Sequence, residues 1–334
     1  MINVGVIGYG YWGPNVVRNF LALTETRVRM ICDRDPGALH RAKELFAPIY
    51  LCRNYSEIIQ SKNINVVAVI TPPSTHFLIA KKALEQGKHI FVEKPFTATV
   101  KEAETLIKIA AKRKLTIMVD HTFLFTGAVR KIKEVVEKNI LGNLYYYDAT
   151  RVSLGLFQQD TNVIWDLAAH DMAILDYVVK NKPAALTAQG MDHMKRGHAN
   201  MAYITIYFSG NMIAHLNVNW MSPVKIRTTM ICGQKKMLLW DDLQPDEKIK
   251  VYDRGVQIKN KEGLYKLRVD YRSGDVWSPR VDHTEALKKE LAYFVDCIKK
   301  NKAPVNDGQA GLRVVRLLEA ANQSLKSRGK LIKL

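Results

Sequence analysis

An apolar run at the N-terminus passes directly into a glycine-rich turn, and this junction constrains the fold more than any other feature of the chain. The run INVGVI is followed by Gly8, Gly10 and Gly13, with Tyr11 and Trp12 between the last two. Glycine weakens strands and helices alike, so three of them this close together indicate a tight turn. A strand that ends in G-x-G-x-x-G and leads into a helix places free backbone N–H groups where a phosphate can bind.

The first 120 residues alternate short apolar runs with amphipathic helical patterns. The runs are rich in β-branched residues and lack a polar face, which is typical of parallel strands buried on both sides. The helical stretches supply the crossovers that parallel strands need. We therefore predict a doubly wound α/β domain over residues 1–120, with a second domain over 121–334. The runs are INVGVIG, RVRMICD, INVVAVIT, KHIFVEK and LTIMVD, and the helical stretches are 14–23, 38–46, 77–85 and 100–112.

A carboxylate ends the second apolar run. Asp33 stands about 20 residues after Gly13, where an acidic side chain accepts hydrogen bonds from the adenosine ribose of a dinucleotide. We therefore expect Gly8, Gly10, Tyr11, Trp12, Gly13, Asp33 and Arg34 to bind a nicotinamide cofactor. The negative charge of Asp33 favours NAD over NADP, although the neighbouring Arg34 would accept a 2′-phosphate.

The pattern changes after Gly142 to longer alternating runs that follow one another without helices. Such runs indicate a mostly antiparallel open sheet, so the second domain is predicted to be α+β. Helical patterns near 165–179 and 284–300 interrupt and follow it, and residues 241–263 form the most loop-like segment. The alternating runs are LYYYDATRVSL, NMAYITIYFS, NMIAHLNVNW and RTTMICG.

Length and composition agree with two soluble domains. The chain has 334 residues, of which 47% are hydrophobic, and no run is long enough to cross a bilayer. Its first residues lack the basic flank and cleavage site of a signal peptide, so we expect a cytoplasmic location. Four scattered cysteines, without clustered histidines, argue against a metal site or disulfides and are predicted to be buried thiols: Cys32, Cys52, Cys232 and Cys297.

The formal net charge is +18, which raises the question of an anionic partner. The excess of lysine and arginine is spread over both halves of the chain, and no single basic face is visible. This spread argues against a nucleic-acid surface and leaves either general solubility or steering of an anionic substrate.

Two apolar runs of the first half end in polar groups at the sheet edge where ligands bind. Thr71 and His76 belong to a proline-stiffened loop and either line the cofactor or form an ordinary turn. Glu93 and Lys94 close a buried run directly before Pro95, where the nicotinamide is expected. The alternative is an exposed strand end, but a lysine here can stabilise the developing charge of a substrate alkoxide.

A helical pattern in the second half carries Asp166 and His170 at positions i and i+4, on one face. Without other evidence, two residues at this spacing more often form an exposed pair, or the histidine is a core residue that makes its hydrogen bonds within the protein. Next to a nicotinamide cofactor, however, oxidation of an alcohol needs a base for the hydroxyl proton, and histidine has a suitable pKa. Asp171 lies on the apolar side with no evident partner. His121, Arg151 and Asn162 are further candidates for contacts with substrate.

The G-x-G-x-x-G turn, the Glu93-Lys94-Pro95 motif and the Asp166/His170 helix, in this order, resemble the glucose-fructose oxidoreductase, inositol dehydrogenase and MocA family over nearly the whole chain. The resemblance implies an N-terminal Rossmann domain, an active-site lysine at Lys94 and the family's motif aspartate and histidine at Asp166 and His170. It also implies a cis peptide bond before Pro95 and homodimers or homotetramers built through the C-terminal sheet.

The chain departs from the family pattern at Ala168 and Ala173, where a glycine and a second aspartate are common, and at Leu124, where an arginine often stands. The segment TRVSLGLFQQDTNVIWDLAAHD resembles the branch that acts on nucleotide sugars. This implies NAD-dependent oxidation at C3 of a UDP-N-acetylglucosamine-type sugar, with His170 as base, Asp166 fixing its ring and Lys94 stabilising the alkoxide.

Three other functions stay open from the sequence. One is dehydrogenation of inositol or a free hexose, and another is glycoside cleavage that uses NAD transiently. The third belongs to a different class, a regulatory protein that senses NAD. Lys94, Asp166 and His170 together argue against the sensor, because a sensor needs no proton acceptor. Direct binding of DNA is disfavoured by the spread of the charge.

Overall fold

The computed structural model describes residues 1–46, 48–155, 161–258 and 269–334, and its contacts divide the chain into two units. Unit 1 contains Met1–Phe125 and Thr284–Glu319, and unit 2 contains Thr126–His283 and Ala320–Leu334. The predicted division at residue 120 differs from these units in two respects, because the first segment extends to Phe125 and Thr284–Glu319 packs with it. Each unit has its own sheet and its own core, and each is described separately below.

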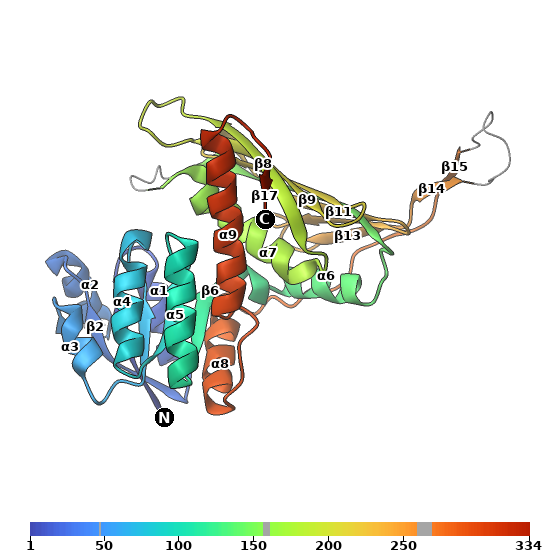
Figure 1. Ribbon diagram of the computed structural model, residues 1–334. Coiled ribbons are helices and arrows are strands. Elements are labelled where there is room, and N and C mark those ends of the chain that lie inside the picture. The colour runs from blue at the N-terminus through green and yellow to red at the C-terminus, as the bar shows by residue number, and fades with distance from the viewer. Residues whose placement is uncertain (47, 156–160, 259–268) are drawn as a thin grey trace. The chain divides into compact units, whose positions relative to one another are not determined.

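Unit 1 is built around a six-stranded parallel sheet in the order β3-β2-β1-β4-β5-β6. Figure 1 labels β2 toward one edge of this sheet and β6 at the other edge. The chain order reverses between β1 and β4, so the carboxyl ends of these strands form the place where doubly wound folds bind ligands. All five predicted runs are strands, and the short β3 was not among them. The strands are β1 (Ile2–Ile7), β2 (Thr26–Cys32), β3 (Tyr50–Cys52), β4 (Val66–Val69), β5 (His89–Glu93) and β6 (Ile117–Asp120).

The helices of unit 1 that were predicted begin close to the expected positions. In α5, for example, Thr99 and Glu102 form a reciprocal capping box, and Ala103, Leu106 and Ala110 are buried. The helices are α1 (Gly13–Leu21), α2 (Pro36–Phe46), α3 (Tyr55–Gln60), α4 (Pro73–Glu85), α5 (Val100–Arg113), α8 (Ala286–Lys299) and α9 (Gly308–Lys326), with a 3-10 turn η1 (Thr122–Phe125). Neither α3 nor α9 was predicted, and the final residues of α9 belong to unit 2.

Two C-terminal segments complete the core of unit 1. The ring of Phe294 on α8 packs against Phe91 on β5, with ring centroids 5.8 Å apart, and Phe91 in turn contacts Phe20 on α1. Asp307 forms a bridge with Met118 on β6. These contacts explain why Thr284–Glu319 belongs to unit 1 although it lies near the end of the chain.

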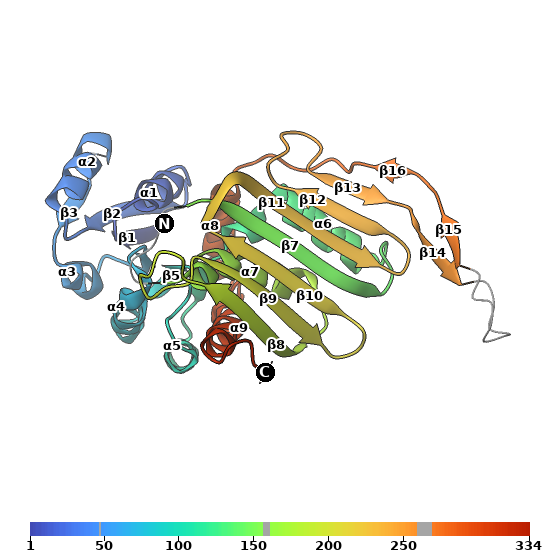
Figure 2. The same ribbon diagram turned by 90° about the horizontal axis from the view of Figure 1, so that it is seen from above.

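Unit 2 is a nine-stranded sheet in the order β16-β13-β12-β11-β7-β10-β9-β8-β17, antiparallel except for the β10–β7 pair (Figure 2). The strands are β7 (Leu144–Leu154), β8 (Pro183–Met191), β9 (Met201–Phe208), β10 (Ile213–Asn219), β11 (Met221–Gly233), β12 (Met237–Asp241), β13 (Ile249–Tyr252), β16 (Val276–Trp277) and β17 (Ile332–Lys333). A separate ribbon pairs β14 (Gly255–Ile258) with β15 (Val269–Arg272). The segment 241–263 therefore contains two strands, and the expectation of a loop was wrong for its described part.

One face of this sheet is covered by α6 (Gly127–Glu137) and α7 (Ala169–Val178) (Figure 2), and a π-helical turn η2 (Ile164–Ala168) contacts β10. Alternation explains the packing, because Ala202, Ile204 and Ile206 of β9 are buried whereas Tyr203 and Tyr207, on the opposite face of the strand, are exposed. The exposed aromatic row fits the predicted assembly into homodimers or homotetramers, which stays a prediction.

Candidate functional site

The glycine-rich turn leaves its backbone open on one side. Gly8 has φ = 100°, and a Cβ there would lie 2.2 Å from the carbonyl oxygen of Ile70, so only glycine fits. A Cβ at Gly10, in contrast, would meet no atom within 4 Å. Helix α1 starts at Gly13 with no acidic residue in its first turn. The turn can therefore bring backbone N–H groups to an anionic pyrophosphate.

A cavity of about 280 Å³ adjoins this turn at the carboxyl ends of β1, β2 and β4. The carboxylate of Asp33 is fixed at its rim, where Oδ2 accepts from the backbone N–H of Tyr9 at 2.6 Å and Oδ1 from that of Asp35 at 2.9 Å. This geometry fits the adenosine half of a dinucleotide. The lining residues are Ile7, Gly8, Gly10, Cys32, Asp33, Arg34, Arg53, Tyr55, Ile70, Thr71, Pro72, Thr75 and Ile79.

Two aromatic residues inside the turn behave differently. Tyr11 is 88% exposed. Trp12 is half-buried, and its indole Nε1–H donates to Oδ2 of Asp120 at 2.8 Å. The turn is therefore tied to the carboxyl end of β6, a link that sequence spacing did not indicate.

The loop after β4 holds its two predicted residues in different settings. Thr71 lines the cavity and shares a 2.7 Å hydroxyl contact with Thr75. His76 is fully buried, and its ring nitrogens lie 2.7 and 2.9 Å from the carbonyl oxygens of Thr71 and Pro95. These contacts give His76 a structural role, because its ring links the loop after β4 to the backbone at Pro95. A direct contact of His76 with a cofactor stays a prediction.

Glu93 and Lys94 lie at the carboxyl end of β5, as expected, and both are half-buried. The peptide bond between Lys94 and Pro95 is cis, as the family resemblance implied. Glu93 is the register partner of Asp120 on β6. Burial raises the pKa of Glu93 well above its ordinary value, with a further rise from Asp120 and a partial offset from Lys94.

A third carboxyl group, Glu290 on α8, joins this pair and was missed by the sequence analysis. It is 0% exposed, and its pKa is raised well above normal by burial first and by Asp120 and Glu93 next. A sequence signal existed, because Leu287, Leu291 and Phe294 place Glu290 on the apolar face of its helix. We call Glu93, Asp120 and Glu290 the carboxyl cluster.

His121, a predicted substrate contact, follows Asp120 directly. Its ring is 2% exposed, and both ring nitrogens lack a hydrogen-bond partner among the described residues. Burial lowers its pKa to about 4, so the ring is neutral at pH 7. Contact with substrate stays a prediction for this buried side chain.

In unit 2, Asp166 and His170 lie on consecutive elements rather than on one α-helix. Asp166 belongs to the π-helical turn η2, and His170 belongs to the first turn of α7. Both are half-buried. Oδ2 of Asp166 accepts from the indole Nε1–H of Trp220 at 3.0 Å, and Trp220 itself is 1% exposed. Such π-helical turns frequently occur at functional sites.

Two other predicted substrate residues have structural partners. Arg151 on β7 donates through Nε and one terminal nitrogen to the two oxygens of Asp171 on α7, at 2.9 and 2.8 Å, and both side chains are buried. This pair answers the question of the Asp171 partner. Asn162 caps η2, since its Oδ1 accepts from the backbone N–H groups of Ile164 and Trp165. Roles in substrate binding stay predictions for both.

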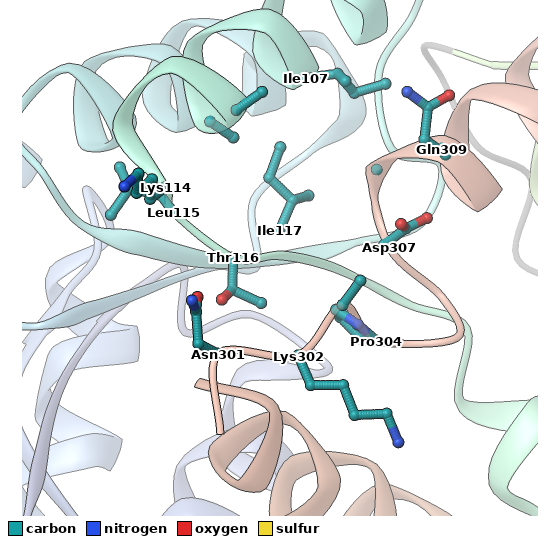
Figure 3. Close-up of a pocket in the computed structure, with 14 residues that line it drawn as sticks. Ile107, Lys114, Leu115, Thr116, Ile117, Asn301, Lys302, Pro304, Asp307 and Gln309 are labelled. Atoms are coloured by element: carbon teal, nitrogen blue, oxygen red, sulfur yellow. The ribbon is translucent and has the colours of Figure 1, made fainter. Parts of the chain in front are cut away.

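A second cavity, of about 420 Å³, lies in unit 1 between the end of α5, the start of β6 and the α8–α9 connection (Figure 3). Its lining includes Ile107, Ile117, Lys302 and Asp307. Because Ile117 begins β6 and Asp120 ends it, this cavity adjoins the opposite end of that strand from the carboxyl cluster.

The described residues contain no group of His, Cys, Asp and Glu arranged to hold a metal ion. Among the same residues, no helix is both long and apolar enough to cross a membrane. Cys32, Cys52 and Cys297 are buried free thiols as predicted, whereas Cys232 is only half-buried.

Family models match most of the chain. The model described as an oxidoreductase family with an NAD-binding Rossmann fold matches residues 2–121. The model of the GFO/IDH/MocA C-terminal domain matches residues 129–239.

Individual relatives match over nearly full length. UDP-N-acetylglucosamine 3-dehydrogenase from Acidithiobacillus ferrooxidans is 26% identical over 319 residues, which cover 94% of each chain. A solved structure of that enzyme has a TM-score of 0.81 at 23% identity and covers 98% of both chains. The structure of scyllo-inositol dehydrogenase from Lactobacillus casei with NAD(H) and scyllo-inositol has a TM-score of 0.80 at 18% identity, covering 100% of this chain and 99% of that one.

Proposed function

The chain belongs to the glucose-fructose oxidoreductase, inositol dehydrogenase and MocA family of NAD-binding oxidoreductases, and from this premise we propose that it oxidises a secondary alcohol at C3 of a UDP-N-acetylglucosamine-type nucleotide sugar. The observation that carries the proposal is the open glycine turn beside a cavity with a fixed carboxylate at Asp33. A dinucleotide fits these residues, and when bound it supplies the hydride acceptor.

NAD is the proposed cofactor rather than NADP. The Asp33 carboxylate already accepts from two backbone N–H groups, so it is held in place to accept from ribose hydroxyls as well. A 2′-phosphate would meet this negative charge at close range. Arg34 and Arg53 line the same cavity and would partly offset the repulsion.

The transfer of the hydroxyl proton and the stabilisation of the alkoxide charge are proposed for three residues. His170 is the proposed base that removes the hydroxyl proton, and Asp166 orients its ring. Trp220 supports this arrangement by fixing Oδ2 of Asp166 at 3.0 Å. Lys94, at the carboxyl end of β5, is proposed to stabilise the alkoxide as the hydride leaves the carbon.

The substrate proposal rests on the relative from Acidithiobacillus ferrooxidans together with the net charge. A formal charge of +18 favours a diphosphate-bearing substrate over a neutral polyol by long-range attraction. The similarity to scyllo-inositol dehydrogenase supports the alternative, a dehydrogenase of inositol or a free hexose.

A panel of assays for NADH formation tests both proposals. UDP-N-acetylglucosamine should give turnover with NAD and less with NADP, and free inositols and hexoses should give little. Activity on scyllo- or myo-inositol without activity on UDP-sugars would overturn the substrate assignment.

Replacing His170 with alanine should lower kcat/KM by about 10²- to 10⁴-fold, because a general base is lost. His215→Ala, on β10, is the matched control, and full turnover in His170→Ala would refute the assignment of the base.

A further inference from the structure

The carboxyl cluster contains a group that the proposed reaction does not use. Glu290 is 0% exposed and comes from α8, more than 160 residues along the chain from Asp120. A buried ionised carboxylate is costly unless donors surround it. The hydrogen bonds to each oxygen atom of Glu290 and of its neighbours therefore decide how this charge is compensated.

The available donors are fewer than the acceptors. Asp120 receives the indole N–H of Trp12 on Oδ2 and the hydroxyl of Thr122 on Oδ1, at 2.8 and 2.5 Å. Glu290 receives the amide Nδ2–H of Asn306 on Oε1 at 2.8 Å. Its other oxygen, Oε2, has no hydrogen-bond partner among the described residues.

The missing donor is a protonated carboxyl group within the cluster. Asn306 places Glu290 beside Asp120, because its Nδ2 group donates both to Oε1 of Glu290 and to the carbonyl oxygen of Val119, the residue before Asp120. Glu93 is the register partner of Asp120 on the neighbouring strand. Two carboxylates cannot hydrogen-bond to each other, whereas a carboxylic acid donates to a carboxylate. The Thr122 hydroxyl lies near both Glu290 and Asp120, and its single hydrogen is donated to Asp120.

Other charged and titratable groups face the cluster from β5 and from the residue after β6. The Lys94 ammonium acts on Glu93 and partly offsets its raised pKa. His121 is within range of the Asp120 charge, and its buried ring, with both nitrogens unpartnered among the described residues, is neutral at pH 7. Oε2 of Glu290 accepts no hydrogen bond from any described residue, so neither of these two groups links it to Asp120.

The cluster is connected to the nucleotide site. Trp12 belongs to the glycine-rich turn and donates directly to Asp120, while Glu93 stands next to Lys94 in the chain. The carboxyl ends of β5 and β6 are at the sheet edge where dinucleotides bind in this fold class. An oxidised nicotinamide ring carries a positive charge, and a reduced ring does not.

We propose that Glu290, Asp120 and Glu93 hold one shared proton in the cofactor-free protein and release it to solvent when oxidised nicotinamide binds, so that the cluster balances the positive charge of the ring. The inference rests on the proposed function. It assigns to Glu290 a positioning role, because the residue acts on the site through Asp120 and Trp12 rather than by touching the reacting atoms.

Calorimetric titration at pH 7 in buffers of different ionisation enthalpy measures the protons released on binding. NAD should release up to about one proton per chain, and its affinity should rise with pH by up to about tenfold per unit. NADH and ADP-ribose, which lack the positive ring, should release clearly fewer protons. Equal release for all three ligands would overturn the inference while leaving the proposed function intact. Failure of every dinucleotide to bind would overturn both.

Two variants separate the cluster from other groups. Glu290→Gln removes the shared proton and should make proton release on NAD binding equal to that on NADH binding. Glu285→Gln is the control, because Glu285 directly precedes α8 but pairs with Arg18 and Asn19. In the cofactor-free protein, infrared absorption of a protonated carboxyl group should be present at pH 7, absent in Glu290→Gln and retained in Glu285→Gln. Absence of that band from the unaltered protein contradicts the inference even if a variant does not fold.

Discussion

At the residue scale, the candidate site combines side chains at strand ends with hydrogen bonds between residues far apart in the chain. Asp33, Glu93 and Lys94 lie at strand ends as expected, because strand boundaries follow from local apolar runs. The bond between Trp12 and Asp120 joins residues 108 apart, and no local pattern specifies such a distance. Glu290 was recognisable as a charge on an apolar helix face, but only the fold shows which carboxyls it meets.

The buried histidine after β6 gives a pH-dependent prediction. The pKa of His121 is lowered from 6.5 to about 4 by burial, so the folded protein binds this proton more weakly than the unfolded chain. Stability should therefore be lost as the pH falls from above 6.5 towards 4. His121→Gln should remove this loss, and between pH 7 and pH 4 the difference in unfolding free energy should shift in favour of the variant by about 3 kcal/mol.

Urea unfolding monitored by circular dichroism at several pH values measures the shift. His40→Gln, at an exposed position on α2, controls for the substitution itself. Parallel pH profiles for His121→Gln and the unaltered protein would show that His121 titrates alike in the folded and unfolded states.

At the element scale, periodicity predicted most helices and strands but not how they end or join. The Asp166/His170 segment was expected to be one α-helix, yet η2 inserts a π-helical turn before α7. The side chain of Asn162 accepts hydrogen bonds from the N–H groups at the start of η2. Trp220, which is 54 residues after Asp166 in the chain, donates a hydrogen bond to the Asp166 carboxylate. A helical hydrophobic pattern cannot distinguish these two kinds of turn, because they differ by about one residue per turn.

The ion pair between β7 and α7 joins two elements that the sequence analysis treated separately. Asp171→Ala should leave the Arg151 guanidinium buried without its carboxylate and should lower the free energy of unfolding by about 3–5 kcal/mol. The double variant Arg151→Met, Asp171→Ala removes the unpaired charge and should recover much of that loss. Chemical unfolding of the three proteins measures these differences. An additive double variant would indicate that the two side chains act independently.

At the scale of the whole molecule, the order of segments in the chain hides the composition of unit 1. Residues 1–120 read as a complete doubly wound domain because their strands and helices alternate. The structure adds Thr284–Glu319 to it. The sequence analysis predicted no helix over the residues of α9, although Leu317, Leu318 and Ala321 on this helix are buried.

This arrangement predicts that the N-terminal segment is incomplete without α8 and the start of α9. Phe294 packs on Phe91, and Asn306 exchanges two hydrogen bonds with Val119 at 2.9 and 2.7 Å. Residues 1–125 alone should therefore expose an apolar face and melt without cooperativity. The same residues joined to 284–319 by a long flexible linker should unfold cooperatively, and Phe294→Ala in the joined chain should cost about 3–5 kcal/mol. Thermal melting followed by circular dichroism compares the three chains. If residues 1–125 alone melt as cooperatively as the joined chain, the C-terminal segment only covers a core that is already complete. Loss of cooperative melting in residues 1–125 alone would confirm instead that unit 1 is assembled from both ends of the sequence.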